Sequence, residues 1–398
     1  MDQAYKIFDN LFLQSVTHSI NTPCYLYDLE LLNQTIRELQ TAYKKYLERP
    51  THIHYAIKAN NHPRILSFIS NNNFGADCVS GGEITEALAN GFNPQHIVFA
   101  GVGKLDWEIE LALKKNIFAF NVESTQEIEV INEIALRLDK VANIFIRVNP
   151  DIDAKTHKNI STGMHSNKFG ISFQDIINYI PNLKRLKNIK LIGLHYHIGS
   201  QITDLSVFRD LCIRINDDYQ KIQKHHIALT DINIGGGLGV DYQNPEHAPI
   251  ANFDEYFKII AQNLNIPNNV SIHFELGRSI IAQSGILLSK VIFTKITANT
   301  NFAVIDAGMN DLMRPALYEA HHKIKLIDSD SFDQPDKQLY NIVGPICEST
   351  DIFAHKVSMP FLQRGQFLVI QSCGAYGRVL ANTYNSRQIV QEYFIQDL

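Results

Sequence analysis

The sequence predicts an α/β protein in which a (β/α)8 barrel is joined to a second, β-rich domain. The chain has 398 residues, more than the roughly 250–300 at which a single hydrophobic core stops growing. Between His52 and Glu275 short β-rich runs alternate with stretches of helical periodicity, which is typical of repeated βα units. Beyond about residue 280 the chain reads as strands with turn-rich connections.

Eight β-rich runs can be counted in the first region. They span residues 52–58, 75–80, 96–101, 118–123, 143–149, 191–199, 231–236 and 271–276. Eight parallel strands with intervening helices are what a (β/α)8 barrel requires. Polar or glycine residues fall at the C-terminal ends of the runs, namely Lys58, Ser80, Glu123, Asn149, His197, Gly235 and Glu275. Because catalytic groups of such barrels collect at the C-terminal rim, we expect the active site there.

The second domain is expected to resemble a β-sandwich or β-barrel. Its strand-like runs are ILLSKVIFTKIT, NFAVIDAG, LYNIVGPIC and QFLVIQSCG. The run TPCYLYD at 22–28 precedes the barrel pattern, and we expect it to pair with this second domain. The predicted organisation is therefore a barrel domain over residues 30–280 and a β-rich domain made of 1–29 and 281–398.

Composition and charge narrow the class of protein. Hydrophobic residues make up 45% and charged residues 19% of the chain, which is typical of a globular protein. The formal net charge is −5 and the acidic residues are scattered, so nucleic acid is not an expected partner. The five cysteines form no CxxC pair, which favours neither a disulfide framework nor a zinc site. The sequence shows no signal-peptide pattern and no run near the ~20 apolar residues of a membrane helix, so we expect a cytoplasmic protein.

Two segments suggest a phosphate-bearing cofactor. Lys58 ends a strand in HYAIKAN, where apolar neighbours would lower the pKa of its amine and suit a Schiff base. The alternative is a lysine that simply reaches solvent. The segment NIGGGLG at 233–239 would let backbone N–H groups close on a phosphate, although a plain tight turn explains it equally well. It matches neither GxGxxG nor GxxxxGK[ST], which disfavours the nucleotide-binding folds.

Three further residues near strand ends are candidates for the same site. Glu275, in HFELGRS, could hold a pyridine nitrogen protonated, or it could form a structural salt bridge to an arginine. His197, in HYHIGSQ, could stack on a planar ring, and Ser200 could donate a hydroxyl to a phosphate. His195 and His54 are weaker candidates, because histidines at strand ends are often only structural.

With these pieces in place, the sequence resembles the fold-type III, alanine-racemase-like pyridoxal-phosphate decarboxylases, and within them the diaminopimelate decarboxylases. The resemblance runs from about Pro23 to Arg387. The matching segments are YAIKAN (55–60), GADCVSGGEI (75–84), NPDIDAKTHKNISTG (149–163), NKFGI (167–171), HIGSQI (197–202), NIGGGLGVDY (233–242), ELGRSI (275–280), DAGMNDLMRPALYEAHH (306–322), VGPICESTD (343–351), GAYG (374–377) and YNSR (384–387).

The resemblance implies a cofactor and its binding residues. The cofactor is pyridoxal 5'-phosphate, with which Lys58 would form the Schiff base. His197 would stack on its ring and Glu275 would pair with its pyridine nitrogen. The other implied cofactor-binding residues are Asp77, Ser200, Gly235, Gly236, Gly237 and Tyr376.

The resemblance also implies a substrate and an assembly. The substrate would be meso-diaminopimelate, decarboxylated to L-lysine and CO2. The implied substrate-binding residues are Arg278, Arg314, Tyr318, Glu348 and Tyr376, and the implied catalytic residues are Lys58, His197 and Cys347. Cys347 and Glu348 would enter the neighbouring subunit's site, which implies a homodimer with shared active sites.

Other functions remain open from the sequence. A related decarboxylase of another amino acid or of a carboxy-polyamine would carry the same cofactor residues, but Arg314 and Tyr318 argue against it. The GPICEST segment argues against a racemase, and the β-rich region argues against a one-domain cofactor-binding protein. The chain departs from the family at Leu276, where proline is common, and at 378–381, which leaves the expected catalytic side chains unchanged.

Overall fold

The structure is a computed structural model, and it describes residues 8, 10–17, 19–152, 168–327 and 337–398. The chain forms two compact units, each assembled from separate stretches of sequence. The barrel unit comprises Ile36–Gly239 and Asn252–Gly277, and the β unit comprises Met1–Thr35, Val240–Ala251 and Arg278–Leu398.

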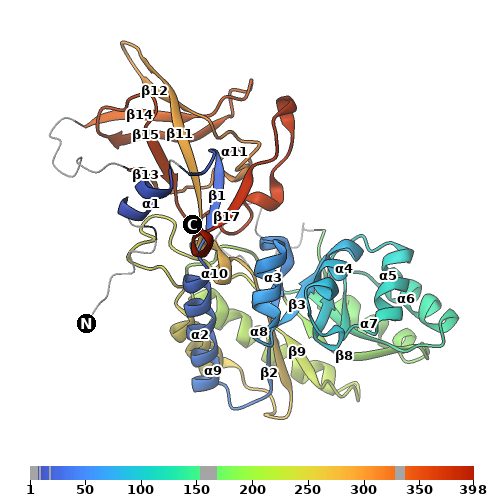
Figure 1. Ribbon diagram of the computed structural model, residues 1–398. Coiled ribbons are helices and arrows are strands. Elements are labelled where there is room, and N and C mark those ends of the chain that lie inside the picture. Colours follow the sequence, from blue (N-terminus) through green and yellow to red (C-terminus); the bar gives the residue numbers. More distant parts are fainter. Residues whose placement is uncertain (1–7, 9, 18, 153–167, 328–336) are drawn as a thin grey trace. The chain divides into compact units, whose positions relative to one another are not determined.

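A closed barrel of eight parallel strands forms the centre of the barrel unit, as predicted (Figure 1). The strands are β2 (Thr51–Ala56), β3 (Gly75–Cys78), β4 (Ile97–Phe99), β5 (Ala119–Val122), β6 (Ala142–Asn149), β8 (Ile189–His195), β9 (Asp231–Asn233) and β10 (Ser271–Leu276). Pairing of β10 with β2 and of β5 with β6 closes the ring. Each of the eight predicted runs overlaps one of these strands. The two-residue strand β7 (Ile171–Ser172) adds to the end of β6.

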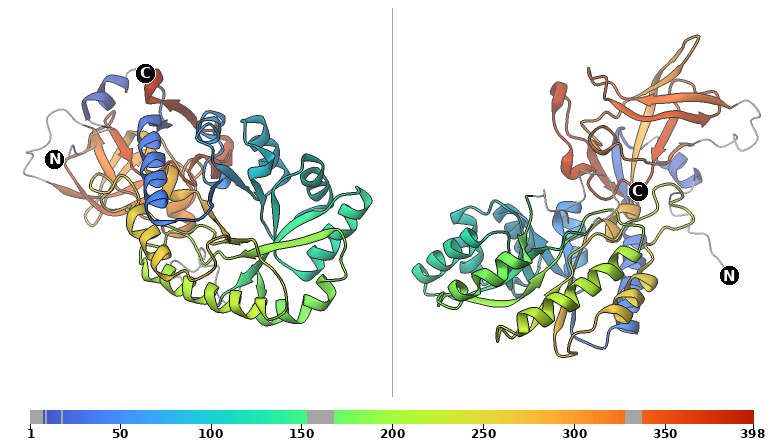
Figure 2. Two further views of the ribbon diagram at one scale, coloured as in Figure 1. Left: turned by 90° about the horizontal axis from the view of Figure 1, so that it is seen from below. Right: turned by 180° about the vertical axis from the view of Figure 1, so that it is seen from behind.

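Helices surround the parallel strands on the outside of the barrel (Figure 2). They are α3 (Pro63–Ser70), α4 (Gly81–Ala89), α5 (Asp106–Lys115), α6 (Thr125–Arg137), α7 (Phe173–Leu183), α8 (Ser206–Gln223) and α9 (Phe253–Asn263), with α2 (Leu29–Tyr46) ahead of β2. Serine caps start α4 and α6, where Ser80 and Ser124 accept hydrogen bonds from the backbone N–H groups of Glu83 and Glu127. Each cap begins a helix directly after a strand end, so the polar residues of the rim are held on short connections.

The β unit is a curled, mostly antiparallel sheet of eight strands. Its main path runs β13 (Ile324–Ile327), β16 (Phe367–Ile370), β11 (Gly285–Ile296), β12 (Asn301–Ile305), β14 (Gln338–Val343) and β15 (Ile352–Met359). The strand β1 (Cys24–Tyr27) pairs antiparallel with β11 and parallel with β17 (Gln391–Phe394). The predicted pairing of the segment 22–28 with the second domain is therefore confirmed.

Apolar side chains from distant parts of the sequence form the core of the β unit. Leu26 from β1, Ile286 and Leu288 from β11, and Val369 from β16 pack in one cluster. Two short helices, α10 (Arg278–Ile281) and α11 (Arg314–Tyr318), carry arginines predicted to bind substrate. None of the helices within the described ranges combines the length and the hydropathy that crossing a membrane demands.

Candidate active site

Lys58 lies just after β2 and contacts a buried carboxylate. Its Nζ is 2.5 Å from Oδ2 of Asp77 on β3, because Ala56 and Asp77 are register partners on the adjacent strands. The side chain of Asp77 is 1% exposed, against 37% for Lys58. Burial raises the pKa of Asp77, and the nearby Lys58 opposes that rise. Lys58 therefore does not simply reach into solvent, which was the alternative explanation for this residue.

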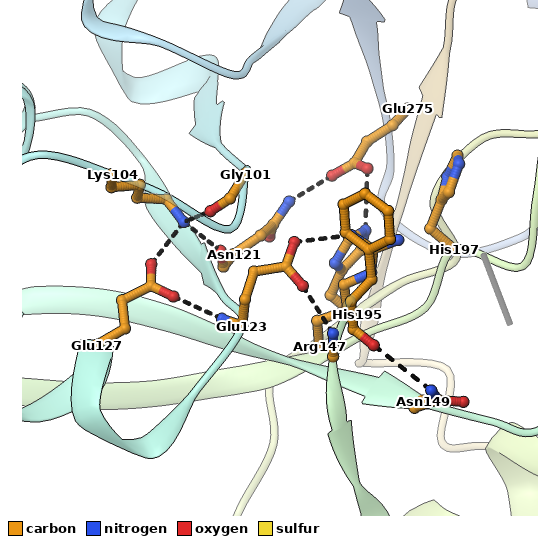
Figure 3. A network of polar contacts seen from close by, with 12 residues as sticks. Gly101, Lys104, Asn121, Glu123, Glu127, Arg147, Asn149, His195, His197 and Glu275 are labelled. Atoms are coloured by element: carbon orange, nitrogen blue, oxygen red, sulfur yellow. Dashed lines mark hydrogen bonds and ion pairs between the residues drawn. The ribbon is translucent and has the colours of Figure 1, made fainter. Parts of the chain in front are cut away.

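Glu275 is held by three hydrogen-bond donors at the end of β10. Figure 3 shows two of them, Asn121 and His195. Oε1 of Glu275 accepts from the amides of Asn121 and Asn233, both at 2.6 Å, and its Oε2 accepts from Nε2 of His195 at 3.0 Å. All four residues are buried. The three donors occupy three of the four lone pairs of a carboxylate and leave one on Oε2.

The environment of Glu275 keeps its carboxylate ionised. Burial alone would raise the pKa of Glu275, but the charge and hydrogen bond of His195 and the charge of Lys58 outweigh burial. The pKa of Glu275 therefore lies below its ordinary range. These partners differ from the salt bridge to arginine that was the structural alternative.

His197 lies beside the glycine segment 235–237. The backbone N–H of Gly236 donates to Nδ1 of His197 at 3.2 Å, so this ring nitrogen carries no proton. Burial and the positive charges of Arg147 and Lys58 hold the pKa of His197 well below its ordinary value. A neutral, flat imidazole is suited to stacking on an aromatic ring.

The glycines make a turn that other residues could not form. Gly235 and Gly237 have φ of +75° and +113°, and a Cβ on Gly235 would collide with the carbonyl oxygen of Tyr196. The backbone of Ile202 brackets this turn, because its N–H donates to the carbonyl of Gly237 and its carbonyl accepts from the N–H of Gly239. Ser200 is therefore on a segment that runs alongside the glycines.

In the β unit, Arg314 at the start of α11 is buried among aromatic and neutral groups. Its guanidinium carbon lies 4.5 Å from the ring centroid of Tyr242, and its Nη1 is 2.7 Å from Nε2 of His322. Arg278 donates from Nη1 to the Tyr242 hydroxyl at 2.7 Å and lies 4.7 Å from the ring centroid of Tyr376. Tyr242 thus contacts both arginines.

Cys347 and Glu348 lie on an exposed segment that forms hydrogen bonds with Tyr384 and Asn385. The N–H of Cys347 donates to Oδ1 of Asn385 at 3.1 Å, and the hydroxyl of Tyr384 donates to Oε1 of Glu348 at 2.5 Å. The thiol of Cys347 is free and exposed. Tyr318 closes α11, four residues after Arg314.

Comparison with known proteins gives a consistent match over nearly the whole chain. Residues 33–282 match the family described as "Pyridoxal-dependent decarboxylase, pyridoxal binding domain". The diaminopimelate decarboxylase of Bacteroides thetaiotaomicron is 45% identical over 381 residues, which are 96% of this chain and 97% of that relative. The chain belongs to the diaminopimelate decarboxylase family.

A second relative and a solved structure agree with this membership. A diaminopimelate decarboxylase of Helicobacter pylori is 41% identical over 380 residues, covering 94% of this chain and 91% of the relative. The crystal structure of the Helicobacter pylori diaminopimelate decarboxylase complexed with L-lysine superposes with a TM-score of 0.88 at 38% identity, covering 97% of this chain and 94% of that one.

The barrel unit offers groups that fit pyridoxal phosphate, the cofactor of this family. Oδ1 of Asp77 is buried close to the amine of Lys58 and has no hydrogen-bond partner in the part of the chain that the structure describes. The N–H groups of Gly235 and Gly236 already donate to Asn233 and His197. The N–H of Gly237, by contrast, has no acceptor within the described ranges, which leaves it available for a phosphate oxygen.

Sequence reasoning missed several residues that the fold brings to these places. Asn121 and Asn233 surround Glu275 together with His195, which the sequence had offered only as a weaker candidate, and Tyr242 and His322 contact Arg314. Asn121 and Glu123 show an available signal, since polar residues at alternate positions of a strand share one face. Of the family segment 149–163, residues 153–163 lie outside the described residues.

Proposed function

We propose that this protein catalyses the pyridoxal-phosphate-dependent decarboxylation of meso-2,6-diaminopimelate to L-lysine and CO2. The observation that carries the substrate assignment is the buried guanidinium of Arg314, which has no carboxylate partner among the residues described. A buried cation without a counter-ion suits a substrate that carries a second carboxylate. Lysine and ornithine have no carboxylate beyond the one at their reacting carbon.

The proposed roles in the barrel unit follow from charge and hydrogen bonding. When bound, pyridoxal phosphate supplies a sink for the electron pair that CO2 loss leaves behind. The remaining lone pair of Glu275 would accept a hydrogen bond from the protonated ring nitrogen of the cofactor. The negative charge of Glu275 would keep that nitrogen protonated. His197 contacts the ring face, while Ser200 and the turn Gly235–Gly237, through the N–H of Gly237, hold the phosphate. Tyr376 of the β unit is proposed to bind the cofactor as well.

Lys58 is proposed to hold the cofactor through its amine. Asp77 holds the Nζ of Lys58 in one position, which would orient this amine for the cofactor.

The β unit is proposed to supply substrate selection and a proton. Arg278 and Arg314, with Tyr318, bind the distal carboxylate through guanidinium forks. Cys347 returns a proton to the carbon that has lost CO2. We propose that Cys347 and Glu348 do this in the site of a second subunit, so that the enzyme is a homodimer in the cytoplasm. The exposure of the Cys347 thiol and the free state of all five cysteines support this proposal.

The test is CO2 release by purified, cofactor-loaded protein. We expect release from meso-diaminopimelate, with lysine as product, and none from LL-diaminopimelate, lysine, ornithine or arginine. A Lys58→Ala variant serves as the control for chemistry that does not depend on the protein. Release only from another amino acid would overturn the substrate assignment while keeping the cofactor roles. If no CO2 is released from any of these amino acids, the decarboxylase proposal is overturned.

A further inference from the structure

Arg314 is a buried cation whose hydrogen-bond and ring partners, His322 and Tyr242, are neutral. The residue is 5% exposed, and it makes no ion pair with a carboxylate in the part of the chain that the structure describes. Its Nε is buried and has no hydrogen-bond partner among the described residues. Burial lowers the pKa of Arg314, and the positive charge of Arg278 lowers it further. Binding of an anion would stabilise such a group, because its positive charge is otherwise poorly compensated.

His322 is set up to accept a hydrogen bond from Arg314. Nδ1 of His322 is 2.8 Å from the carbonyl oxygen of Gln371, which can only accept, so the proton of the neutral ring is on Nδ1. Nε2 therefore presents its lone pair to Nη1 of Arg314 at 2.7 Å. His322 is 1% exposed. Burial and the charge of Arg314 hold its pKa well below the ordinary value, so the ring stays neutral.

Tyr242 fixes the plane of the same guanidinium. The ring of Tyr242 lies 4.5 Å from the guanidinium carbon of Arg314 and meets the ring of His322 edge-on, with centroids 5.2 Å apart. A guanidinium against an aromatic face keeps its N–H groups free for in-plane acceptors. Tyr242 and His322 together restrict two directions of motion of Arg314 without neutralising its charge.

We propose that His322 and Tyr242 are positioning residues that orient Arg314 for the distal carboxylate of the substrate, and that they set the preference for a dicarboxylic amino acid. This inference rests on the proposed function. An acidic residue in either place would hold Arg314 equally well but would also cancel its charge. Two neutral partners orient the guanidinium of Arg314, and its positive charge stays available for the carboxylate of the substrate.

The central variant is His322→Leu, which removes the acceptor and keeps a buried apolar side chain. We expect KM for meso-diaminopimelate to rise by roughly ten- to hundredfold, the range for losing a hydrogen bond to a charged group. The kcat should change much less. Inhibition by the product L-lysine, which keeps the distal carboxylate, should weaken in parallel. The absorbance of the bound cofactor and its affinity should stay as in the unmodified protein.

Three further variants make the result specific. His322→Gln keeps an oxygen acceptor and should recover most of the lost affinity, which a packing defect alone would not allow. Tyr242→Leu removes the ring under the guanidinium and should raise KM in the same way as His322→Leu. His321→Leu alters the exposed neighbouring histidine and should leave KM and kcat unchanged.

The outcomes separate this inference from the proposed function. If the unmodified protein releases no CO2 from meso-diaminopimelate, the proposed function fails. If it does release CO2 but His322→Leu leaves KM unchanged, or His322→Gln is as defective as His322→Leu, the inference fails and the proposed function stands. A fall in kcat with unchanged KM would likewise overturn it, because that pattern marks an interaction made in the reacting state.

Discussion

At the scale of single residues, Glu275 shows how neighbours decide what a carboxylate does. Three donors from three other strands surround it, namely Asn121 from β5, Asn233 from β9 and His195 from β8. A buried carboxylate without such donors would take up a proton. Here the donors stabilise the anion, and the remaining lone pair is the position at which a ring N–H can bind.

The Glu275→Gln variant tests this role. The amide keeps the size of the side chain but lacks the negative charge, so the ring nitrogen would no longer be held protonated. We expect kcat to fall by several powers of ten while KM for meso-diaminopimelate changes little. Steady-state kinetics with the loaded enzyme measure both constants. An unchanged kcat in this variant would contradict the role proposed for Glu275.

The site residues proposed from the strand pattern of the sequence are those that end a strand. Lys58 and Glu275 could be found because each lies at the carboxyl end of an apolar run. His322 could not, since its function depends on Gln371, which is 49 residues away in the chain and supplies the carbonyl that sets its tautomer.

At the scale of elements, the turn after β9 is defined by its glycines. Gly235 has φ of +75°, a region that costs residues with a side chain about 1–2 kcal/mol. Its missing Cβ also leaves room for the carbonyl oxygen of Tyr196. The turn that leaves the N–H of Gly237 available therefore requires glycine at position 235.

We expect Gly235→Ala to weaken cofactor binding by more than tenfold and to lower the thermal midpoint of the loaded protein. The matched control is Gly365→Ala, which introduces the same strain at φ of +96° but has no atom within 4 Å of the added Cβ. That variant should lose only the ~1–2 kcal/mol of backbone strain and bind the cofactor normally. Fluorescence titration of the cofactor distinguishes the two. Equal cofactor affinity in both variants would contradict the role given to the turn.

Strand positions were predicted more completely in the barrel unit than in the β unit. All eight barrel runs overlap a strand, because apolar runs bounded by polar ends mark buried strands well. The strands β13, β15 and β17 were not predicted. The sequence IFAHKVSM of β15 mixes polar and apolar residues, and such a strand is specified by its pairing with β14 rather than by its own pattern.

At the scale of the whole molecule, buried acids make stability depend on pH. Asp311 is 2% exposed, and burial raises its pKa to about 6. Since the folded state holds this proton more tightly than the unfolded chain, Asp311 contributes stability below the ordinary pKa of aspartate. That contribution is lost as pH rises through about 6.

Asp311→Asn should remove this pH dependence. We expect the free energy of unfolding of the variant, relative to that of the unmodified protein, to rise steadily between pH 4 and 7. The change across that window should be on the order of 1–3 kcal/mol. Scanning calorimetry at matched ionic strength provides the measurement. A difference between the two proteins that stays constant with pH would show that Asp311 titrates alike in the folded and unfolded states.

The proposed sharing of active sites between subunits can be tested by mixing variants. Lys58→Ala and Cys347→Ala should each be nearly inactive as pure proteins. If Cys347 acts in the neighbouring subunit's site, mixed dimers contain one intact site, and activity should partly return after subunit exchange. Differently tagged subunits allow the mixed dimers to be isolated. Mixed dimers as inactive as their parents would place both residues in one subunit's site.

The sequence by itself determined the fold class, the order of the barrel strands, the cofactor and the residues at strand ends, because periodicity and short motifs are local properties of the chain. Only the tertiary structure decided which groups surround those residues. Asn121 and Asn233 reach Glu275 from strands 154 and 42 residues away. Closing the barrel brings such strands together, and the resulting hydrogen bonds and burial set the charge states on which the chemistry depends.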